Sequence, residues 1–427
     1  MQSEAPLRVL ISGGGIAGPA IAFWLSRLGH ACTIVERSAS LRSQGQQIDI
    51  REQGVEVARR MGLLDHVRRC SVGEEGTEFV DVDGKAQAYF PQSPDGEFTS
   101  LTTEYEIMRG SLCRLLHEAT KDFVTYKFGV TVDTFDKTNE GVMVSLSDGS
   151  TAMYDLLIGA DGQGSRIRKK LLADKGLSDS IRSLGAFGGY YSIRRQARDD
   201  RNIASVCLAP KRRVMMTRWH SKTQGQAYLF AMSNVQLLRE ALKQGPQEQK
   251  MALKTVFCDA GWQATRLAEA LDTASDFYLQ EVVQVRSECW HQGRVVLLGD
   301  AGYCPSPFTG MGTTLALVGA YVLAGELARR PRDIRGAVEA YDKTLRPFVQ
   351  DVQKLAWGMP DLIYQRTALQ VWAMNMFLWL LSIVMPVLKP WLDLLPLREP
   401  KWKLPDYAEL KVKTDSQIMG RDEILLT

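Results

Sequence analysis

The glycine-rich start of this 427-residue chain constrains its fold more than any other feature. Residues 7–11 are mostly aliphatic, which predicts a short buried parallel strand. The turn at 13–18 has the spacing GxGxxG, and residues 20–28 have helical composition and end at a glycine. A second aliphatic strand, 31–35, is followed by Glu36. This order of strand, turn, helix, strand and acid predicts a dinucleotide-binding βαβ unit.

Each part of this unit has a physical role in holding a dinucleotide. The first glycine permits a tight turn, the second lets the pyrophosphate approach the backbone, and the third lets helix and strand pack closely. The free N–H groups at the helix N-terminus attract the phosphates. The acid accepts hydrogen bonds from a ribose 2′-hydroxyl, which favours FAD or NAD over NADP. The predicted cofactor-binding residues of the unit are Gly13, Gly15, Ile16, Ala17, Gly18, Glu36 and Arg37.

Two further motifs lie downstream. Residues 155–168 place a buried strand before an Asp-Gly turn and a basic helix. Residues 294–313 place an apolar strand before Gly299 and Asp300, then a loop rich in Pro and Gly, and a long helix follows at 314–328. Taken alone, each motif is equally consistent with a surface turn between a strand and a helix. Together, in this order, they indicate one nucleotide-binding architecture.

At these three motifs the sequence resembles the class A flavoprotein monooxygenases, the family of para-hydroxybenzoate hydroxylase and the tetracycline-inactivating monooxygenases. The resemblance covers about residues 7–350 and implies that the first motif holds FAD. It also implies that the Asp-Gly motif contacts both FAD and NADPH, that the acid of the Gly-Asp motif binds the ribitol chain, and that the amides after it meet the flavin ring. Such amides at a helix N-terminus would stabilise the anionic reduced flavin. The residues carried over are Asp161, Gly299, Asp300, Gly310, Gly312 and Thr313.

Three more positions match the tetracycline-inactivating relatives. Asp49 corresponds to an Asp that binds FAD, and Arg109, at the start of an apolar-periodic helix, to an Arg that contacts the flavin. Arg42 falls where an Arg has been linked to NADPH; a solvated surface charge is the alternative interpretation. Many relatives have Ala-His where this chain has Gly302 and Tyr303. That departure leaves FAD binding intact and puts a histidine-mediated proton path in doubt.

The middle of the chain, residues 181–282, has the pattern of antiparallel strands. The family places there a sheet that covers the flavin and shapes the substrate pocket. An aromatic residue on such a sheet is also a common core residue. The expected substrate contacts are Tyr191, Met216, Arg218, Phe230 and Phe308, and the expected catalytic residues are Tyr228, Arg194 and Arg213. A cation beside Tyr228 would lower the pKa of a phenol and so help to activate it.

The sequence contains one GxGxxG motif and no second copy. A flavoprotein with two dinucleotide-binding domains needs a second one. Class A monooxygenases do without it, because NADPH docks transiently in a shared cleft. The expected cofactors are therefore FAD, with NADPH or NADH as co-substrate.

These observations predict an α/β fold, with a Rossmann-type FAD-binding domain, a mixed β-sheet substrate domain and a C-terminal helical segment. The FAD-binding domain is expected at 1–180 and 283–355, interrupted by a substrate-domain insertion at 76–104. The substrate domain is expected at 181–282, and the C-terminal helical region at 356–427.

Composition excludes several classes of function. The net charge is +3, from 52 basic and 49 acidic side chains, so no bulk charge indicates nucleic-acid binding. The seven cysteines form no CxxC pair, and no histidines stand at ligand spacing. This pattern argues against a disulfide scaffold and a zinc site, and it predicts a reducing, cytoplasmic location and no metal.

The segment 367–388 carries no charged residue and is rich in Trp, Leu, Met and Val. As a helix it would span roughly 33 Å, which is enough for a bilayer core. Pro386, Gln370 and the lack of a strong basic flank argue against spanning. We expect a bracing helix packed on the flavin domain or on a second copy in a homodimer, with weak membrane association as the alternative.

The resemblance implies an FAD-dependent NAD(P)H monooxygenase of secondary metabolism. In this family reduced flavin and O₂ form a C4a-hydroperoxyflavin, which would hydroxylate or epoxidise an electron-rich aromatic or polyketide-like small molecule. Two alternatives stay open: a flavin oxidase or dehydrogenase on the same fold, and a non-catalytic FAD-binding partner protein. The fold by itself does not decide between them.

Overall fold

The computed structural model describes residues 5–41, 45–92, 103–197, 199–355, 359–392 and 402–411. One part of the molecule is built on a six-stranded sheet in the order β17-β18-β11-β1-β2-β7. Its strands run parallel, except that β17 pairs antiparallel with β18. The strands are β1 (Arg8–Ser12), β2 (Ala31–Glu36), β7 (Val124–Phe128), β11 (Leu156–Gly159), β17 (His291–Gln292) and β18 (Val295–Leu297).

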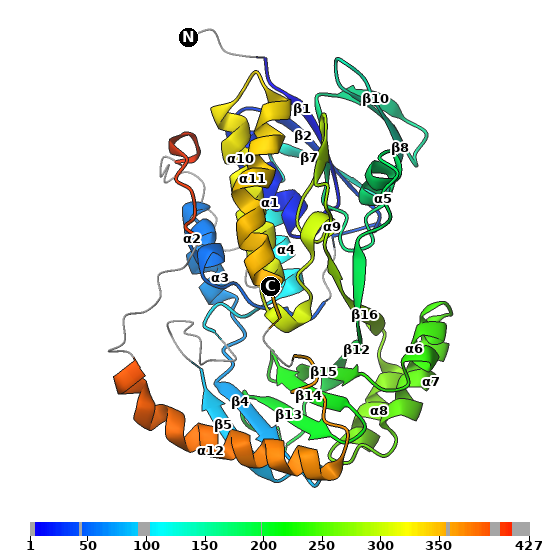
Figure 1. Cartoon of the computed structure of the whole chain (residues 1–427), viewed down its shortest axis with the longest axis vertical. Coiled ribbons are helices and arrows are strands. Elements are labelled where there is room, and N and C mark those ends of the chain that lie inside the picture. The colour runs from blue at the N-terminus through cyan, green and yellow to red at the C-terminus, as the bar shows by residue number, and fades with distance from the viewer. Residues whose placement is uncertain are drawn as a thin grey trace.

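Helices cover one face of this sheet, and a small antiparallel sheet with one helix covers the other (Figure 1, upper half). Val9 and Ile11 point into the core shared with α1, α4, α10 and α11, and Leu10 points into the core shared with α5 and the sheet β10-β9-β8. This alternation follows from the two-residue period of a strand. The covering elements are α1 (Ala17–Arg27), α4 (Arg109–Glu118), α10 (Gly312–Arg329), α11 (Ile334–Val352), α5 (Arg166–Ala173), β8 (Val132–Lys137), β9 (Val142–Leu146) and β10 (Thr151–Tyr154).

The second part of the molecule is a seven-stranded sheet in the order β16-β12-β15-β14-β13-β4-β5. Most neighbours pair antiparallel, but β4 runs parallel to β13. Because β4 and β5 precede the rest by about a hundred residues, the chain enters this sheet twice. The strands are β4 (Gly76–Val80), β5 (Ala86–Pro91), β12 (Ile181–Arg194), β13 (Ala204–Ala209), β14 (Arg213–Trp219), β15 (Gln224–Ala231) and β16 (Tyr278–Val285).

Different elements pack on the two faces of the seven-stranded sheet. On the back face, Tyr191, Met215 and Leu229 pack with three helices in one apolar core. On the front face, Met216 and Phe230 belong to a smaller apolar cluster with residues from elsewhere in the chain. The helices of the back face are α6 (Val235–Leu242), α7 (Pro246–Phe257) and α8 (Ala264–Thr273).

Helix α12 (Ala368–Leu392) lies along the seven-stranded sheet, in contact with β5, β4 and β13 (Figure 1, orange). The sequence favoured packing on the flavin domain or on a second copy; in the structure α12 packs on the seven-stranded sheet instead of the flavin domain, and contact with a second copy stays a prediction. The reason is that Val371 of α12 joins Val206, Leu208 and Val214 in the front-face cluster. Within the described residues, Ala368–Leu388 is long and apolar enough to cross a membrane, with a mean hydropathy of 1.9.

The last described residues of the chain return to the six-stranded part. The Trp402 ring stacks on Phe348 with centroids 4.6 Å apart. The Tyr407 ring fills the space beside Gly325, and its hydroxyl donates to Glu326 Oε1 at 2.7 Å. The bracing contact expected from the apolar helix is therefore made by the segment that follows it.

The α/β class, with a Rossmann-type nucleotide-binding sheet and a C-terminal helix, is confirmed. Strands β4 and β5 fall within 76–104 and β12 to β15 within 181–282, while the exact division of the chain into domains stays a prediction. The remaining elements are β3 (Gln47–Ile48), β6 (Ile107–Met108), α2 (Gln53–Arg60), α3 (Leu64–Arg69), α9 (Asp300–Tyr303), η1 (Pro307–Thr309) and η2 (Ala408–Leu410).

Candidate active site

The turn between β1 and α1 has the shape that its glycines permit. Gly13 has φ +114°, and a Cβ there would lie 2.3 Å from the carbonyl oxygen of Ala160. A Cβ on Gly18 would lie 2.0 Å from the carbonyl oxygen of Gly13. The nearest atom to a Cβ on Gly15 is instead Nη2 of Arg109, at 4.0 Å. The fold therefore requires Gly13 and Gly18, whereas Gly15 leaves the turn open to a ligand.

Glu36, at the end of β2, points back to this turn. Its Oε2 accepts a hydrogen bond from the N–H of Gly14 at 2.8 Å, and its Oε1 accepts one from the N–H of Ser38 at 2.9 Å. These hydrogen bonds fix the carboxylate beside the start of α1, which is the position needed for a contact with a ribose. The neighbouring Arg37 side chain is exposed.

Two helices begin near the site with free N–H groups. Helix α1 has Ile16 as its N-cap and Ala17 as its first residue, and α10 has Met311 and Gly312 in these positions. In the described part of the chain no side chain caps either helix. A Cβ on Gly312 would have no atom within 4 Å, while Thr313 is buried in the first turn. Uncapped N-termini of this kind attract anionic groups.

The Gly-Asp motif lies between β18 and α9 and packs against the start of α1. Gly299 has φ +64°, and a Cβ there would lie 3.1 Å from the Cβ of Ala17. The Asp300 side chain is reached by solvent, yet the surrounding protein desolvates it and raises its pKa, while the charge of Arg109 lowers it. The exposed carboxylate of Asp300 can accept hydrogen bonds from the hydroxyl groups of a ligand.

Arg109 connects the first and third motifs. Its N–H donates to the carbonyl of Gln46 at 3.1 Å, which fixes the start of α4. A Cβ on Gly45 would lie 3.1 Å from Arg109 Cδ, so the side chain passes close to that glycine on its way toward Gly15. The same guanidinium acts on the pKa of Asp300. This position between a glycine turn and an acid suits a phosphate or flavin contact.

The Asp-Gly motif is linked to the Gly-Asp motif by a buried arginine. Arg168 Nη1 donates to the carbonyl of Ala301 at 2.9 Å, and Nη2 donates to the carbonyl of Gln163 at 2.7 Å. Asp161 Oδ2 accepts a hydrogen bond from the N–H of Arg166 at 2.9 Å. Asp161 Oδ1 is buried and has no hydrogen-bond partner among the described residues, and burial raises the pKa of this acid.

These residues fit FAD. The dinucleotide needs an unobstructed backbone at its pyrophosphate, acids at its sugar hydroxyls and N–H groups at its flavin ring. Gly15, Glu36, Asp300 and Gly312 offer these features with the exposure and spacing described above. The unpaired Oδ1 of Asp161 offers one more acceptor in the same region.

The segment after β3 packs on the loop that precedes α10. Asp49 Oδ2 pairs with Arg51 Nε at 2.6 Å, and Thr103 donates to the other oxygen. The N–H of Arg51 donates to Thr314 Oγ1 at 2.9 Å, and a Cβ on Gly310 would lie 3.7 Å from Arg51 Nε. Asp49 is therefore held near the loop of Gly310, as its predicted FAD contact requires.

A row of aromatic side chains crosses the front face of the seven-stranded sheet. Met216, Tyr228, Tyr190 and Tyr278 are successive cross-strand partners. Tyr190 stacks on Tyr278 with centroids 4.8 Å apart and meets Tyr228 edge-on at 5.2 Å. Phe230 meets Tyr190 edge-on at 5.5 Å. Tyr190 and Tyr228 are buried in this row, whereas Met216, Phe230 and Tyr278 are partly buried.

The loop before α10 reaches this face. Phe308 packs on the cluster that contains Met216 and Phe230, and its ring lies 5.9 Å from that of Tyr364. Three predicted substrate contacts, Met216, Phe230 and Phe308, are thus brought together, and Phe308 stands two residues before Gly310.

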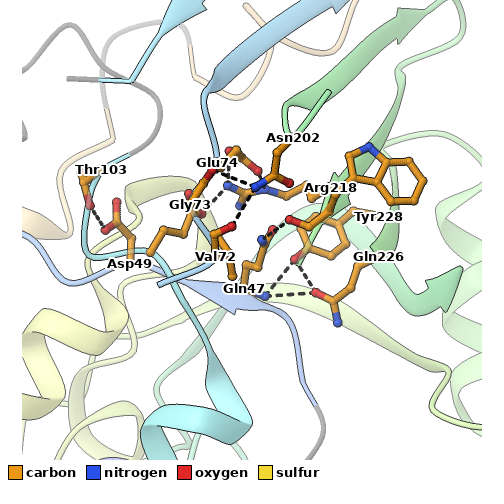
Figure 2. A network of polar contacts seen from close by, with 12 residues as sticks. Gln47, Asp49, Val72, Gly73, Glu74, Thr103, Asn202, Arg218, Gln226 and Tyr228 are labelled. Atoms are coloured by element: carbon orange, nitrogen blue, oxygen red, sulfur yellow. Dashed lines mark hydrogen bonds and ion pairs between the residues drawn. The ribbon is translucent and has the colours of Figure 1, made fainter. Parts of the chain in front are cut away.

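Tyr228 is hydrogen-bonded to the segment that contains β3 (Figure 2). Its hydroxyl donates to Gln226 Oε1 at 2.8 Å and accepts from the N–H of Gln47 at 2.9 Å. Gln226 Nε2 donates to the carbonyl of Gly45 at 2.9 Å. Burial raises the pKa of Tyr228, although the charge of Arg218 lowers it, so the phenol stays protonated at neutral pH.

Arg218 lies between two buried carboxylates, and Figure 2 shows one of them, Glu74. Nε and Nη2 of Arg218 donate to Glu74 at 2.9 and 2.7 Å, and Nη2 also pairs with Glu106. Burial raises the pKa of Glu106 to about 8, with Arg218 acting in the opposite direction. Protein carboxylates therefore already pair with this guanidinium, which argues against the substrate contact predicted for Arg218.

Three other predicted site residues lie away from the aromatic row. Tyr191 is on the back face, where its hydroxyl donates to a carbonyl of α8 at 2.8 Å. Arg213 is on the same back face and pairs with Asp259. Arg194 is exposed at the end of β12. Tyr191 and Arg213 are therefore corrected: adjacent strand residues point to opposite faces, so choosing Tyr191 in place of Tyr190 reversed the face.

The sequence interpretation missed Tyr190 and the carboxylates Glu74 and Glu106. The sequence did carry a signal for Tyr190. In the alternating pattern of β12, Tyr190 lies on the same face as polar Ser192, and apolar Ile193 lies on the opposite face. Glu74 and Glu106 stand in no motif and approach each other only in the folded chain. No local pattern could have identified them.

Comparison with known proteins agrees with this geometry. The family model for the FAD binding domain matches residues 6–356. FAD-dependent monooxygenase asL4 of Sarocladium schorii is 37% identical, over 95% of this chain and 99% of its own length. Flavin-dependent monooxygenase eupH of Phoma sp is 40% identical, over 83% of this chain and 87% of its own length. The chain belongs to the FAD-dependent monooxygenases.

Solved structures support the same family. Tetracycline destructase Tet(51) superposes on this monooxygenase with a TM-score of 0.72 and 29% identity, over 94% of this chain and 100% of its own. Klebsiella pneumoniae HpxO, complexed with FAD and uric acid, has a TM-score of 0.69 at 21% identity, over 89% of this chain and 95% of its own, and shows the shared fold. The predicted enzyme class and the cofactor FAD are confirmed. The contacts of individual residues with FAD stay predictions.

Proposed function

We propose that this monooxygenase inserts one atom of O₂ into an electron-rich aromatic or polyketide-like small molecule, with NADPH or NADH as electron donor. The observation that carries the proposal is the aromatic row on the front face beside the loop of Phe308. Met216, Phe230 and Phe308 are only partly buried and would bind a planar ring system by apolar contact. The likeness to a tetracycline destructase supports a substrate with fused rings.

FAD, when bound, supplies the oxygen activation that the side chains of the protein cannot supply. Glu36, Arg109 and Asp300 would hold it, and Gly15 would leave room for its pyrophosphate. The free N–H groups at the start of α10 would stabilise negative charge at the flavin ring. The apolar cluster around Phe308 would keep water away from the reacting atoms.

The electron donor is proposed from the family resemblance. Arg42, the residue proposed to contact NADPH, lies outside the described residues. Asp161, proposed to contact both FAD and NADPH, keeps a buried acceptor oxygen for such a contact. The seven cysteines are all free, which supports a reducing compartment such as the cytoplasm.

We assign Tyr228 a positioning role in place of acid–base chemistry. A protonated phenol whose oxygen already donates and accepts hydrogen bonds is no general base. Its bonds hold the segment of Gln47 against the front face, and this segment continues to Asp49 and the loop of Gly310. Arg218 is the cation near Tyr228, since Arg194 and Arg213 lie elsewhere.

The test is a panel of phenols and polyketide-like compounds screened for stimulated NADPH oxidation. With a compound that stimulates, ¹⁸O₂ should label the product and H₂¹⁸O should not. Label from water alone would contradict oxygen transfer and indicate an oxidase or dehydrogenase. Full FAD content with no stimulation across the panel would favour a non-catalytic FAD-binding protein.

A further inference from the structure

Helix α12 is apolar on both sides, and the described protein covers its inner side. Val371, Met374 and Leu378 face the front-face cluster of the seven-stranded sheet. The outer side is exposed: within the described residues, nine of the fifteen exposed large apolar side chains belong to this one helix. They are Leu369, Trp372, Met376, Phe377, Trp379, Leu380, Ile383, Val387 and Leu388.

The exposed side chains form a continuous stripe. Leu369, Trp372, Met376, Trp379 and Ile383 recur at spacings of three and four residues, which places them on one face of a helix. A helix on the surface of a soluble protein normally carries charged and polar residues on this face. An apolar patch of this size marks an interaction surface.

Both ends of α12 are attached to the same protein body. Before the helix, the carbonyls of Gln365 and Arg366 accept hydrogen bonds from the β13–β14 turn at 2.8 and 2.9 Å. After it, Trp402 and Tyr407 pack on α11 and α10. Between these ends the helix lies along the sheet (Figure 1). It is long enough to cross a membrane, but its contacts with the sheet hold it against the surface of the protein.

We propose that the outer face of α12 docks the protein on the surface of an anionic lipid membrane, with the helix in the plane of the headgroups. An apolar face of this length enters the boundary between headgroups and acyl chains. The indoles of Trp372 and Trp379 suit that boundary, because they are apolar rings with a polar N–H. The sequence has no acidic residue from 362 to 392, and Arg366 is exposed just before the helix. The stripe can therefore approach anionic headgroups without repulsion from a carboxylate of its own.

The experiment is flotation of the full-length, FAD-loaded protein with vesicles of phosphatidylcholine, with and without phosphatidylserine. The wild-type protein should float with the anionic vesicles. The triple variant Trp372→Gln/Trp379→Gln/Ile383→Gln should lose at least about tenfold in membrane partitioning, because it removes three exposed apolar side chains. The matched control Leu237→Gln/Met251→Gln changes exposed apolar residues of α6 and α7 and should float normally.

Three results would overturn the proposal. One is equal flotation of the triple variant and the wild type. Another is a wild-type protein that does not bind vesicles and is a dimer by light scattering, while the triple variant is a monomer. In that case the outer face would bind a second copy of the chain. The third is binding to phosphatidylcholine alone that phosphatidylserine does not improve. FAD content should stay unchanged in every variant, since the altered side chains are exposed and none belongs to the front-face cluster or the back core.

Discussion

The nucleotide-binding loops and the front face of the seven-stranded sheet, which we propose to be the two sides of the active site, are held by different contacts. The loops depend on backbone approaches between near neighbours, such as Gly13 and Gly18. The front face depends on side chains that are far apart in sequence, such as Arg218 with Glu74 and Glu106. Adding a methyl group should disrupt the backbone contacts of the loops, whereas removing a charge should disrupt the ion pairs of the front face. Mutations can therefore separate cofactor binding from stability.

Gly15→Val should have the largest effect on the loops. A Cβ at Gly15 meets no atom closer than 4.0 Å, so the protein should fold, but the added side chain fills the approach of the pyrophosphate. We expect about a tenfold or greater loss of bound FAD, measured by absorbance after gel filtration. Gly18→Ala should instead lower the unfolding temperature, because its Cβ would lie 2.0 Å from the carbonyl of Gly13. Full FAD content in Gly15→Val would refute this distinction.

Arg218→Met tests the front face. It leaves Glu74 and Glu106 buried without their cation, which should cost about 3–5 kcal/mol of unfolding free energy. The matched control is Arg213→Met on the back face, whose partner Asp259 has half of its side chain exposed. That carboxylate can be hydrated, so the control should lose less, as measured by denaturant unfolding of FAD-loaded protein. Equal losses would show that the paired carboxylates do not control stability.

Tyr228→Phe compares the two faces with the smallest chemical change. Each variant, Tyr228→Phe or Tyr191→Phe, removes one hydroxyl that makes buried hydrogen bonds, at about 1 kcal/mol. Tyr228 bonds to the segment of Gln47, so its variant should lower kcat/KM for a substrate found in the ligand panel. Tyr191→Phe should leave kcat/KM unchanged. The reverse ranking would place the substrate on the back face.

Glu106→Gln should change the pH dependence of stability. The folded protein raises the pKa of Glu106 from 4.5 to about 8, so it binds this proton more tightly than the unfolded chain does. The free energy of unfolding therefore falls as pH rises through this range. The variant lacks this titration, and its stability relative to wild type should increase from pH 5 to pH 8. Parallel unfolding curves across these pH values would rule out a titrating Glu106.

The sequence was sufficient for the loops because their chemistry is local. Gly13, Gly15 and Gly18 lie within six residues, and their spacing itself describes the turn that they form. Asp300 and Arg109 required the family resemblance, but the structure places both near this turn.

The front face could not be predicted to the same depth. Strand composition identified β14 and β15, but the face of each residue depends on register, and an error of one residue exchanged Tyr190 for Tyr191. Arg218 was expected to contact substrate because its partners Glu74 and Glu106 are more than a hundred residues away in sequence. The position of α12 was equally hidden, since its sequence is apolar on every side.

The alternation of β14 and β15 also defines a search space for directed evolution. Met216 and Phe230 point to the front, while Met215 and Leu229 point into the back core. A combinatorial library restricted to Met216 and Phe230 would change the surface offered to a substrate and leave the back core and the Arg218 ion pairs untouched. Substrate specificity could then be selected with little effect on folding.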